Sequence, residues 1–272
     1  MSTKGIYTAL SGAMAQNLKL DSIANNIANV NTPGFKRDQQ VFREYLTAHE
    51  KPPEVIQVPK DVAAIESFYN IQGGDKSFVE GVGTFTDHGQ GTVKNTGGTL
   101  DLAIDGDGFF EVLTPQGTRF TRAGNFTLDG NGTLVTKDGY FVLGQGDAGS
   151  EPQDRVIQMT GQGAITVTDG GEVLQGQEPM AKIGVVRIAE KDAIEKVGNS
   201  MYSFKNGFNP TVENLESPNL RQGFLEMSNV NVVQEMTDMI TTNRVFEMAQ
   251  KAIQSHDTMA DKMINIVGKV QG

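Results

Sequence analysis

The three histidines are the side chains best suited to proton transfer or metal binding, and their spacing favours neither role. His49, His88 and His256 have no histidine four positions away and none adjacent, so no pair could bind a metal from one helix face. His256 falls on an apolar stripe near the C-terminus, which favours a packed or interface residue. Cysteine is absent, which excludes thiolate metal sites, disulfides and cysteine nucleophiles. We therefore expect no metal site, no cofactor and no catalytic histidine.

Several glycine-rich runs resemble ligand-binding loops. Residues 144–149 have the glycine spacing of a dinucleotide-binding loop, but no helix pattern opens at the last glycine, and we interpret the run as an ordinary loop. Residues 105–108 and 129–132 carry aspartates without the alternating ligands and terminal glutamate of a calcium loop. We predict hairpin turns at both places. No serine-hydrolase motif or paired carboxylates stand out, so nothing in the sequence points to an enzyme.

Composition narrows the class of protein further. The chain has 272 residues, of which 38% are hydrophobic and 21% charged, so it can form a core. Its formal charge of −10 argues against nucleic acid or an anionic membrane as the main partner. No run approaches the ~18 apolar residues of a membrane span. The first thirty residues lack the apolar centre of a cleaved signal peptide.

Glycine is distributed unevenly along the chain. Of 32 glycines, three fall in residues 1–45 and two in residues 228–272, which leaves 27 between them. Because glycine is disfavoured inside helices and common in turns, this predicts helices at both ends and a β-rich middle.

Both ends carry apolar residues that alternate in steps of three and four, the pattern of a helix-packing seam. The N-terminal seam ends at Pro33-Gly34, and the C-terminal pattern predicts one helix of roughly 35–40 residues, because no proline or glycine lies between Gly223 and Gly268. The predicted interface residues are Ile6, Leu10, Ala13, Leu20, Ile27, Val245, Ala249, Ala252, Met259, Met263, Ile266 and Val270.

The middle of the chain contains short apolar or alternating runs separated by turn signals. A spacing of about 8–12 residues is typical of an antiparallel sheet or a barrel-like β domain. The predicted strands are 100–104, 109–113, 119–122, 133–136, 140–143, 165–168 and 183–189.

The expected fold class is α+β, with long N- and C-terminal helices paired as a coiled coil, an antiparallel β-rich central domain and an extended connector. A helix with apolar stripes cannot stand alone in water, so we expect the two ends to pack on each other and on further copies of the chain. The expected division is 1–32 for the first helix, 33–80 for the connector, 81–205 for the β-rich body, 206–226 for the return connector and 227–272 for the last helix.

Residues 24–36, Ala-Asn-Asn-Ile-Ala-Asn-Val-Asn-Thr-Pro-Gly-Phe-Lys, resemble the signature of the bacterial flagellar rod and hook family. Two further blocks also resemble this family, one in residues 100–136 and one in residues 225–233. The resemblance implies an assembly motif made of Ala24, Asn25, Asn26, Ala28, Asn29, Thr32, Pro33, Gly34 and Phe35. Asparagine is a poor helix former. Its side-chain amides could form hydrogen bonds with neighbouring subunits or cap the end of the helix. The alternative is that the asparagines only mark a helix end that frays around Pro33.

The resemblance also implies a function. Members of the family are structural subunits of the flagellar basal body that polymerise into the drive shaft transmitting torque from motor to hook. We would then expect partners among copies of the chain, proximal and distal rod subunits and the type III export apparatus, and a location in the rod across the periplasm. Residues 184–188 and 196–202 look closest to the larger proximal rod subunit, with the distal rod subunit as the alternative. A soluble β binding module with helical ends is a further alternative, in which both ends would be ordered in the monomer.

Overall fold

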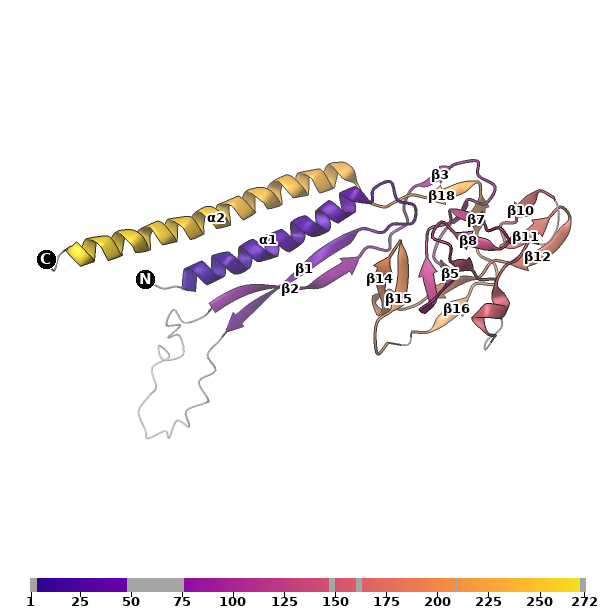
Figure 1. The fold of residues 1–272 in the computed structure, drawn as a ribbon, viewed down its shortest axis with the longest axis horizontal. Coiled ribbons are helices and arrows are strands. Elements are labelled where there is room, and N and C mark those ends of the chain that lie inside the picture. The colour runs from indigo at the N-terminus through magenta and orange to yellow at the C-terminus, as the bar shows by residue number, and fades with distance from the viewer. Residues whose placement is uncertain (1–3, 48–75, 147–149, 160–162, 209, 270–272) are drawn as a thin grey trace, which may run out of the picture. The chain divides into compact units, whose positions relative to one another are not determined.

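The computed structural model describes residues 4–47, 76–146, 150–159, 163–208 and 210–269. Its fold is α+β, as predicted, with a helix at each end and a β-rich middle (Figure 1). The chain divides into two compact units. Unit 1 contains Met1–Asn25, Asp38–Phe85 and Val233–Gly272, and unit 2 contains Asn26–Arg37 and Thr86–Val232.

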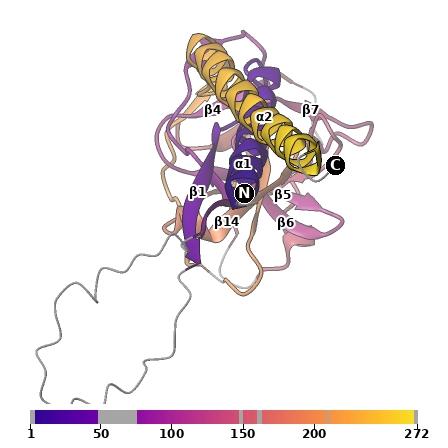
Figure 2. The ribbon, with the colours of Figure 1, turned by 90° about the vertical axis from the view of Figure 1, so that its left-hand side faces the viewer.

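The two helices are single continuous rods (Figures 1 and 2). Helix α1 spans Lys4–Ala28, and α2 spans Val232–Lys269 with 38 residues, within the predicted length. A short turn follows α1, in which the amide of Thr32 donates to the carbonyl of Asn29, and Pro33 comes directly after it. Neither helix, over its described residues, is apolar enough to cross a membrane.

The predicted helix seam is only partly buried in this single chain. Ala13 of α1 is buried, whereas the Leu10 side chain is 44% exposed. In α2, Val245, Met259 and Met263 are all exposed. The side chain of Ile266 and all of Val270 lie outside the described residues. The coiled coil therefore stays a prediction.

Unit 1 also contains a two-stranded sheet, made of β1 (Asp38–Thr47) and β2 (Lys76–Thr86). Helix α1 is bonded to both strands: the Ser22 hydroxyl donates to the Asp38 carbonyl at 3.2 Å, and the Val79 amide donates to the Ser11 hydroxyl at 3.4 Å. These strands occupy the two ends of the segment expected to be an extended connector, whose residues 48–75 lie outside the described part of the chain.

Unit 2 is built mainly of short strands that pair antiparallel. They are β3 (Val93–Asn95), β4 (Leu102–Ile104), β5 (Phe109–Thr114), β6 (Gly117–Thr121), β7 (Phe126–Leu128), β8 (Leu134–Thr136), β9 (Phe141–Val142), β10 (Ile165–Val167), β11 (Glu172–Gln175), β12 (Glu178–Lys182), β13 (Val185–Ile188), β14 (Ile194–Gly198), β15 (Met201–Phe204), β16 (Val212–Asn214), β17 (Leu220–Gln222) and β18 (Phe224–Glu226). Two short 3-10 helices, Pro152–Arg155 and Lys191–Ala193, connect some of them.

The largest sheet of unit 2 has nine strands and runs in the order β14-β15-β6-β5-β9-β8-β7, with β13 and β16 joined beside β5. The strands β10, β11 and β12 form a separate sheet, and β4 pairs with β17 while β3 pairs with β18. The main core contains Phe110, Val112, Val142 and Ile183, all nearly inaccessible to solvent. Strands β3 and β4, which come early in unit 2, thus pair with β18 and β17, the last strands before α2.

One of the two turn predictions is confirmed and the other is wrong. Residues 129–132 join β7 to β8, which pair, and the Asp129 carboxylate accepts bonds from the amides of Asn131 and Thr133. Residues 105–108 do not close a hairpin, because β4 pairs with β17 and not with β5. Two apolar runs around a glycine-rich turn have the local pattern of a hairpin. Here the first run, β4, pairs instead with β17 from a distant part of the chain.

Candidate functional site: a buried ionic cluster

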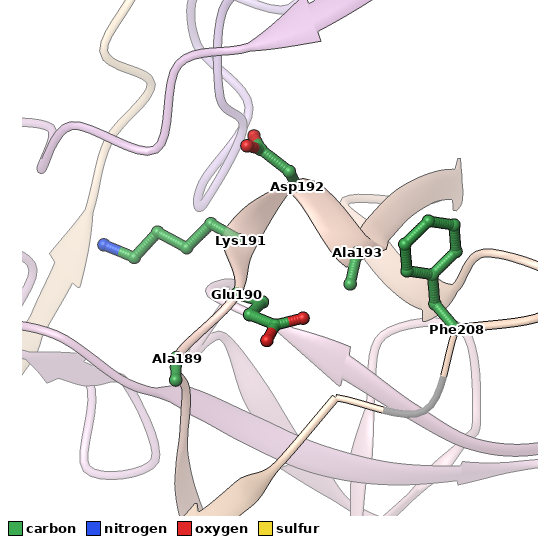
Figure 3. A pocket seen from close by; sticks show the side chains of 6 residues that line it. All are labelled: Ala189, Glu190, Lys191, Asp192, Ala193 and Phe208. Atoms are coloured by element: carbon green, nitrogen blue, oxygen red, sulfur yellow. The ribbon is translucent and has the colours of Figure 1, made fainter.

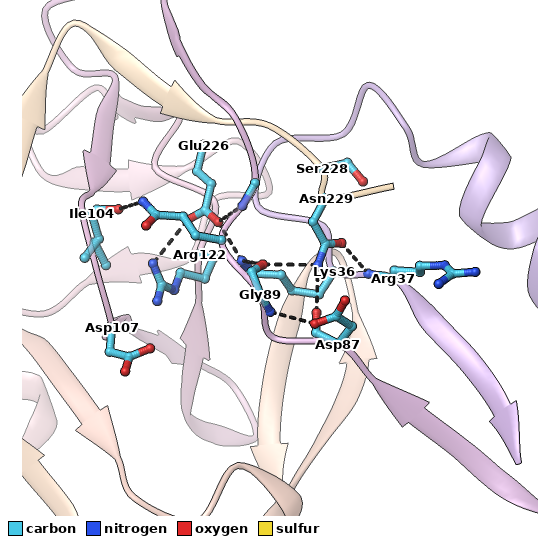
Figure 4. Close-up of polar contacts among 12 residues, drawn as sticks. Lys36, Arg37, Asp87, Gly89, Ile104, Asp107, Arg122, Glu226, Ser228 and Asn229 are labelled. Atoms are coloured by element: carbon cyan, nitrogen blue, oxygen red, sulfur yellow. Dashed lines mark hydrogen bonds and ion pairs between the residues drawn. The ribbon is translucent and has the colours of Figure 1, made fainter. Parts of the chain in front are cut away.

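Three charged side chains from distant parts of the sequence meet inside unit 2 (Figure 4). The Nζ of Lys36 lies 2.5 Å from Oε1 of Glu226, and Nη1 of Arg122 lies 3.2 Å from Oε2 of the same carboxylate. The side chains of Lys36, Arg122 and Glu226 are only 1%, 3% and 1% exposed. We call these three residues the ionic cluster. Burial without pairing would cost each charge several kcal/mol, so the three depend on one another.

Each member is delivered by a different element. Lys36 follows the turn after α1, Arg122 comes directly after β6, and Glu226 ends β18. Gly34 permits the close approach that brings these segments together. Its φ is +68°, and a Cβ at this position would lie 2.3 Å from the amide nitrogen of Ala123. Its own amide donates to the Glu226 carbonyl at 2.8 Å.

The loop between β2 and β3 is fixed by the same residues. The Lys36 ammonium donates to the Gly89 carbonyl at 2.8 Å, and the Gly91 amide donates to Oε1 of Glu226 at 2.9 Å. A Cβ on Gly91 would lie 1.9 Å from the Met227 carbonyl oxygen, which shows how closely the loop approaches the segment after β18. The loop therefore lies against both the start and the end of unit 2, which we call the body from here on.

The Asn229 side chain adds a second set of bonds beside the ionic cluster (Figure 4). Its Oδ1 accepts from the Arg37 amide at 2.7 Å, and its Nδ2 donates to the carbonyl of Asp87 at 2.9 Å. The Asp87 amide in turn donates to the Arg37 carbonyl at 2.8 Å. Every one of these bonds joins segments that are remote in the sequence.

The electrostatics of the site follow from burial. Desolvation lowers the pKa of Lys36, an effect that the Glu226 carboxylate opposes and the Arg122 guanidinium reinforces. Arg122 also donates through Nη2 to the Gly106 carbonyl at 2.8 Å and lies 5.3 Å from the ring centroid of Phe109. With two cations and one carboxylate, the ionic cluster depends most on Glu226.

His88, in the same loop, is a packed residue. Its ring lies edge-on to Phe109 with centroids 6.1 Å apart, and 5.5 Å from the ring of Tyr202. Burial is the main reason that its pKa falls to about 4, with further contributions from nearby cations, of which Lys191 is the largest. At neutral pH this imidazole is uncharged.

Among the described residues, two other kinds of site, a hollow in unit 2 and a metal-binding group, are not supported. A hollow of about 460 Å³ is lined by Ala189, Glu190, Lys191, Asp192, Ala193 and Phe208 (Figure 3). The Lys191 ammonium is already paired with the Asp107 carboxylate at 2.9 Å. Over the described residues, no group of three or more histidine, cysteine, aspartate or glutamate side chains could hold a metal ion.

The predicted assembly motif ends at Phe35, directly before Lys36 in the sequence, and its residues differ in burial. Asn26, Gly34 and Phe35 are buried, while Ala24, Asn25 and Ala28 are exposed. The Thr32 hydroxyl donates to Oδ1 of Asn29 at 3.1 Å, and Pro33 is partly buried. The Lys196 ammonium lies 4.1 Å from the ring centroid of Phe35.

The ionic cluster was not predicted from the sequence. The signature at 24–36 carries one charge, on Lys36, and the block at 225–233 carries one, on Glu226, and a single charge in an otherwise uncharged block is a hint of burial with a partner. The block at 100–136 carries seven charges, so nothing in the sequence singles out Arg122.

Three family models match the chain. They are "Flagella basal body rod protein" at residues 6–36, "Flagellar hook protein FlgE/F/G D1 domain" at 103–175 and "Flagellar basal body rod FlgEFG protein C-terminal" at 221–266. Each matched segment contributes one member of the ionic cluster. Together, these matches indicate a flagellar rod or hook protein.

Curated relatives cover nearly the whole chain. The flagellar basal-body rod protein FlgG of Bacillus subtilis is 36% identical over 97% of this chain and 98% of its own length. The flagellar basal-body rod proteins FlgF of Rhizobium meliloti and Caulobacter vibrioides are 34% and 33% identical, each over 97% of this chain and 98% of their own length. The chain therefore belongs to the flagellar basal-body rod protein family.

Proposed function

We propose that the chain is a structural subunit of the bacterial flagellar basal-body rod and not an enzyme. The similarity of rod proteins over nearly the full length is the observation that carries this proposal. The ionic cluster supports it, because its buried charges hold segments together and present no nucleophile or acid–base pair to a substrate. Deleting the gene in the source bacterium should abolish motility and leave basal bodies without a complete rod. Normal rods in the deletion strain would contradict the proposal.

The ends of the chain are the surfaces we propose for polymerisation. Tyr7 and Met14 of α1 are about 60% exposed, and α2 exposes Val233, Ile240 and Met248. Exposed apolar side chains along long helices are stabilised when they pack on other helices. We propose that α1 and α2 pair as a coiled coil through the predicted seam and that further copies and other rod subunits cover the remaining apolar surface.

The asparagines before Pro33 fit a role at the end of α1. Asn26 is 1% exposed in the single chain, which favours a contact within the subunit, while Asn25 and Asn31 are exposed and could reach a neighbour. The test is Asn26→Ala, with Asn25→Ala as its exposed counterpart. Unchanged rod assembly and motility in the Asn26 variant would remove this residue from the assembly motif.

The position in the rod and the route to it are further proposals. Identity to FlgG and FlgF relatives is similar, so our proposal of the proximal position rests on residues 184–188 and 196–202. We propose that the chain travels through the flagellar type III export apparatus without a cleaved signal and functions where the rod crosses the periplasm. Complementation separates the positions: the gene should restore motility to a strain lacking FlgF, and rescue of a strain lacking only FlgG would favour the distal position.

A further inference from the structure

The chain passes between its two units at four places, after residues 25, 37, 85 and 232. The segments next to three of these crossings are bonded to one another inside unit 2. The Gly34 amide binds the Glu226 carbonyl, and the Asp87 amide binds the Arg37 carbonyl. The Met227 amide binds the Thr92 carbonyl at 2.9 Å. The segments that lead toward α2 and away from α1 therefore share one set of contacts.

We propose that the ionic cluster is a latch, so that segment 34–37 at the start of the body and segment 224–229 at its end are held or released together. The Glu226 carboxylate is the shared element, because it accepts from Lys36, from Arg122 and from the Gly91 amide. Lys36 is the matching element from the first segment, since its ammonium binds both Glu226 and the Gly89 carbonyl. Loss of either side chain removes bonds from segment 34–37, from segment 224–229 and from the loop that contains Gly89 and Gly91.

The order of these residues in the sequence determines which part of the latch is present first when the chain is delivered from its N-terminus. Lys36 and Arg122 precede Glu226, so any process that delivers the chain from its N-terminus provides the two cations before their carboxylate. Until then, burying the cations is unfavourable, and β3 and β4 also lack their partners β18 and β17. The start of the body is therefore held only when residue 226 is present. If the chain is a rod subunit, segments 34–37 and 224–229 come together only when the complete subunit is present.

The test is amide hydrogen exchange on the isolated full-length chain with the substitution Lys36→Met. This variant keeps the Arg122–Glu226 pair, so we expect it to fold. The latch predicts that exchange at the Met227 amide, in the opposite segment, rises at least 10-fold together with exchange at Gly34. The reciprocal variant Glu226→Gln should accelerate exchange at Gly34 and Asp87. A rise confined to the mutated segment would overturn the inference.

A matched control removes a nearby lysine charge outside the latch. Lys191→Met breaks the exposed pair with Asp107 and should leave exchange at Met227 and Gly34 unchanged. If Lys36→Met does not fold, Lys36→Arg provides the same measurement, because a planar guanidinium does not reproduce the lysine bonds to both Gly89 and Glu226. All of these measurements use unassembled chain, so their outcome is independent of whether the protein forms rods.

Discussion

Glu226 and Lys36 form a buried ion pair across 190 positions of sequence, with nitrogen and oxygen 2.5 Å apart and both side chains 1% exposed. The pair joins the last strand before α2 to the segment that follows the turn after α1. A buried ion pair is weak support for overall stability, because desolvation offsets much of the attraction between the charges. Its clearer effect here is specific: it determines which segments lie together where the chain enters and leaves the body.

Glu226→Gln should be the most damaging single change in the ionic cluster. It leaves Lys36 and Arg122 buried without a carboxylate, for which we expect a loss of about 3–5 kcal/mol in the free energy of unfolding. Lys36→Met should cost less, because a balanced Arg122–Glu226 pair remains. Urea unfolding followed by circular dichroism measures both. Equal losses in the two variants would show that the carboxylate is not the shared element.

Gly34→Ala should destabilise the body through a clash as well as through backbone strain. The added Cβ would lie 2.3 Å from the Ala123 amide nitrogen, and φ is +68°. We expect a loss of more than about 2 kcal/mol in the free energy of unfolding. Gly176→Ala is the matched control, since φ there is +69° and nothing lies within 4 Å of the Cβ position. The control should lose only about 1 kcal/mol, the cost of a left-handed alanine. Similar losses at both positions would leave no role for the close approach.

His88 should make the body less stable in acid. Its pKa is lowered from 6.5 to about 4 in the folded chain, so the unfolded chain takes up the proton first as the pH falls. The free energy of unfolding should therefore decrease from pH 6.5 down to about 4 and then stop changing on account of this residue. The groups responsible besides burial are Lys191, Lys36, Lys196 and Arg122.

The variant His88→Gln isolates this effect from the carboxylates that titrate in the same range. Subtracting its stability profile from that of the unchanged chain should leave a slope between pH 6.5 and about 4, with the difference shrinking toward acid. A flat difference would mean that His88 titrates alike in the folded and unfolded chain.

The apolar surface of α2 should be required for assembly and dispensable for the fold of the body. Met248 is 59% exposed, so Met248→Asp should leave the circular dichroism of the strands unchanged while reducing motility to the level of the deletion strain. Gln250→Asp adds the same charge two residues away at an exposed polar position and should swim normally. Normal swimming by the Met248 variant would exclude this part of α2 from the subunit contacts.

The sequence predicted the elements with strong local signals. The spacing of apolar residues and the lack of internal proline and glycine predicted α2, and the short apolar runs predicted strands such as β5 and β13. Strands such as β16 were missed, because every residue of β16 is exposed and its pairing with β13 depends on a distant segment. Strands β17 and β18 lie in the same expected return connector, 206–226. Both contain buried residues, but their partners β4 and β3 are far away in the sequence, so no local pattern marks them as strands.

The ionic cluster shows a second limit of sequence analysis. Lys36 and Glu226 stand out only as single charges in their blocks, Arg122 is one of several charges in its block, and the predicted assembly motif stopped at Phe35, one residue before Lys36. What makes these residues special is their mutual burial, and burial follows from the pairing of β18 with β3 and from the approach of Gly34 to Ala123. Neither relationship has a local signature.

The most direct test of the account is a cryo-electron microscopy map of the basal body from the source bacterium, at a resolution that shows side chains. We predict that this chain occupies the rod, with Met14 of α1 and Met248 of α2 packed against neighbouring subunits and the Lys36–Glu226 pair intact in every copy. A rod built without this chain, or one in which both methionines face solvent, would contradict the account.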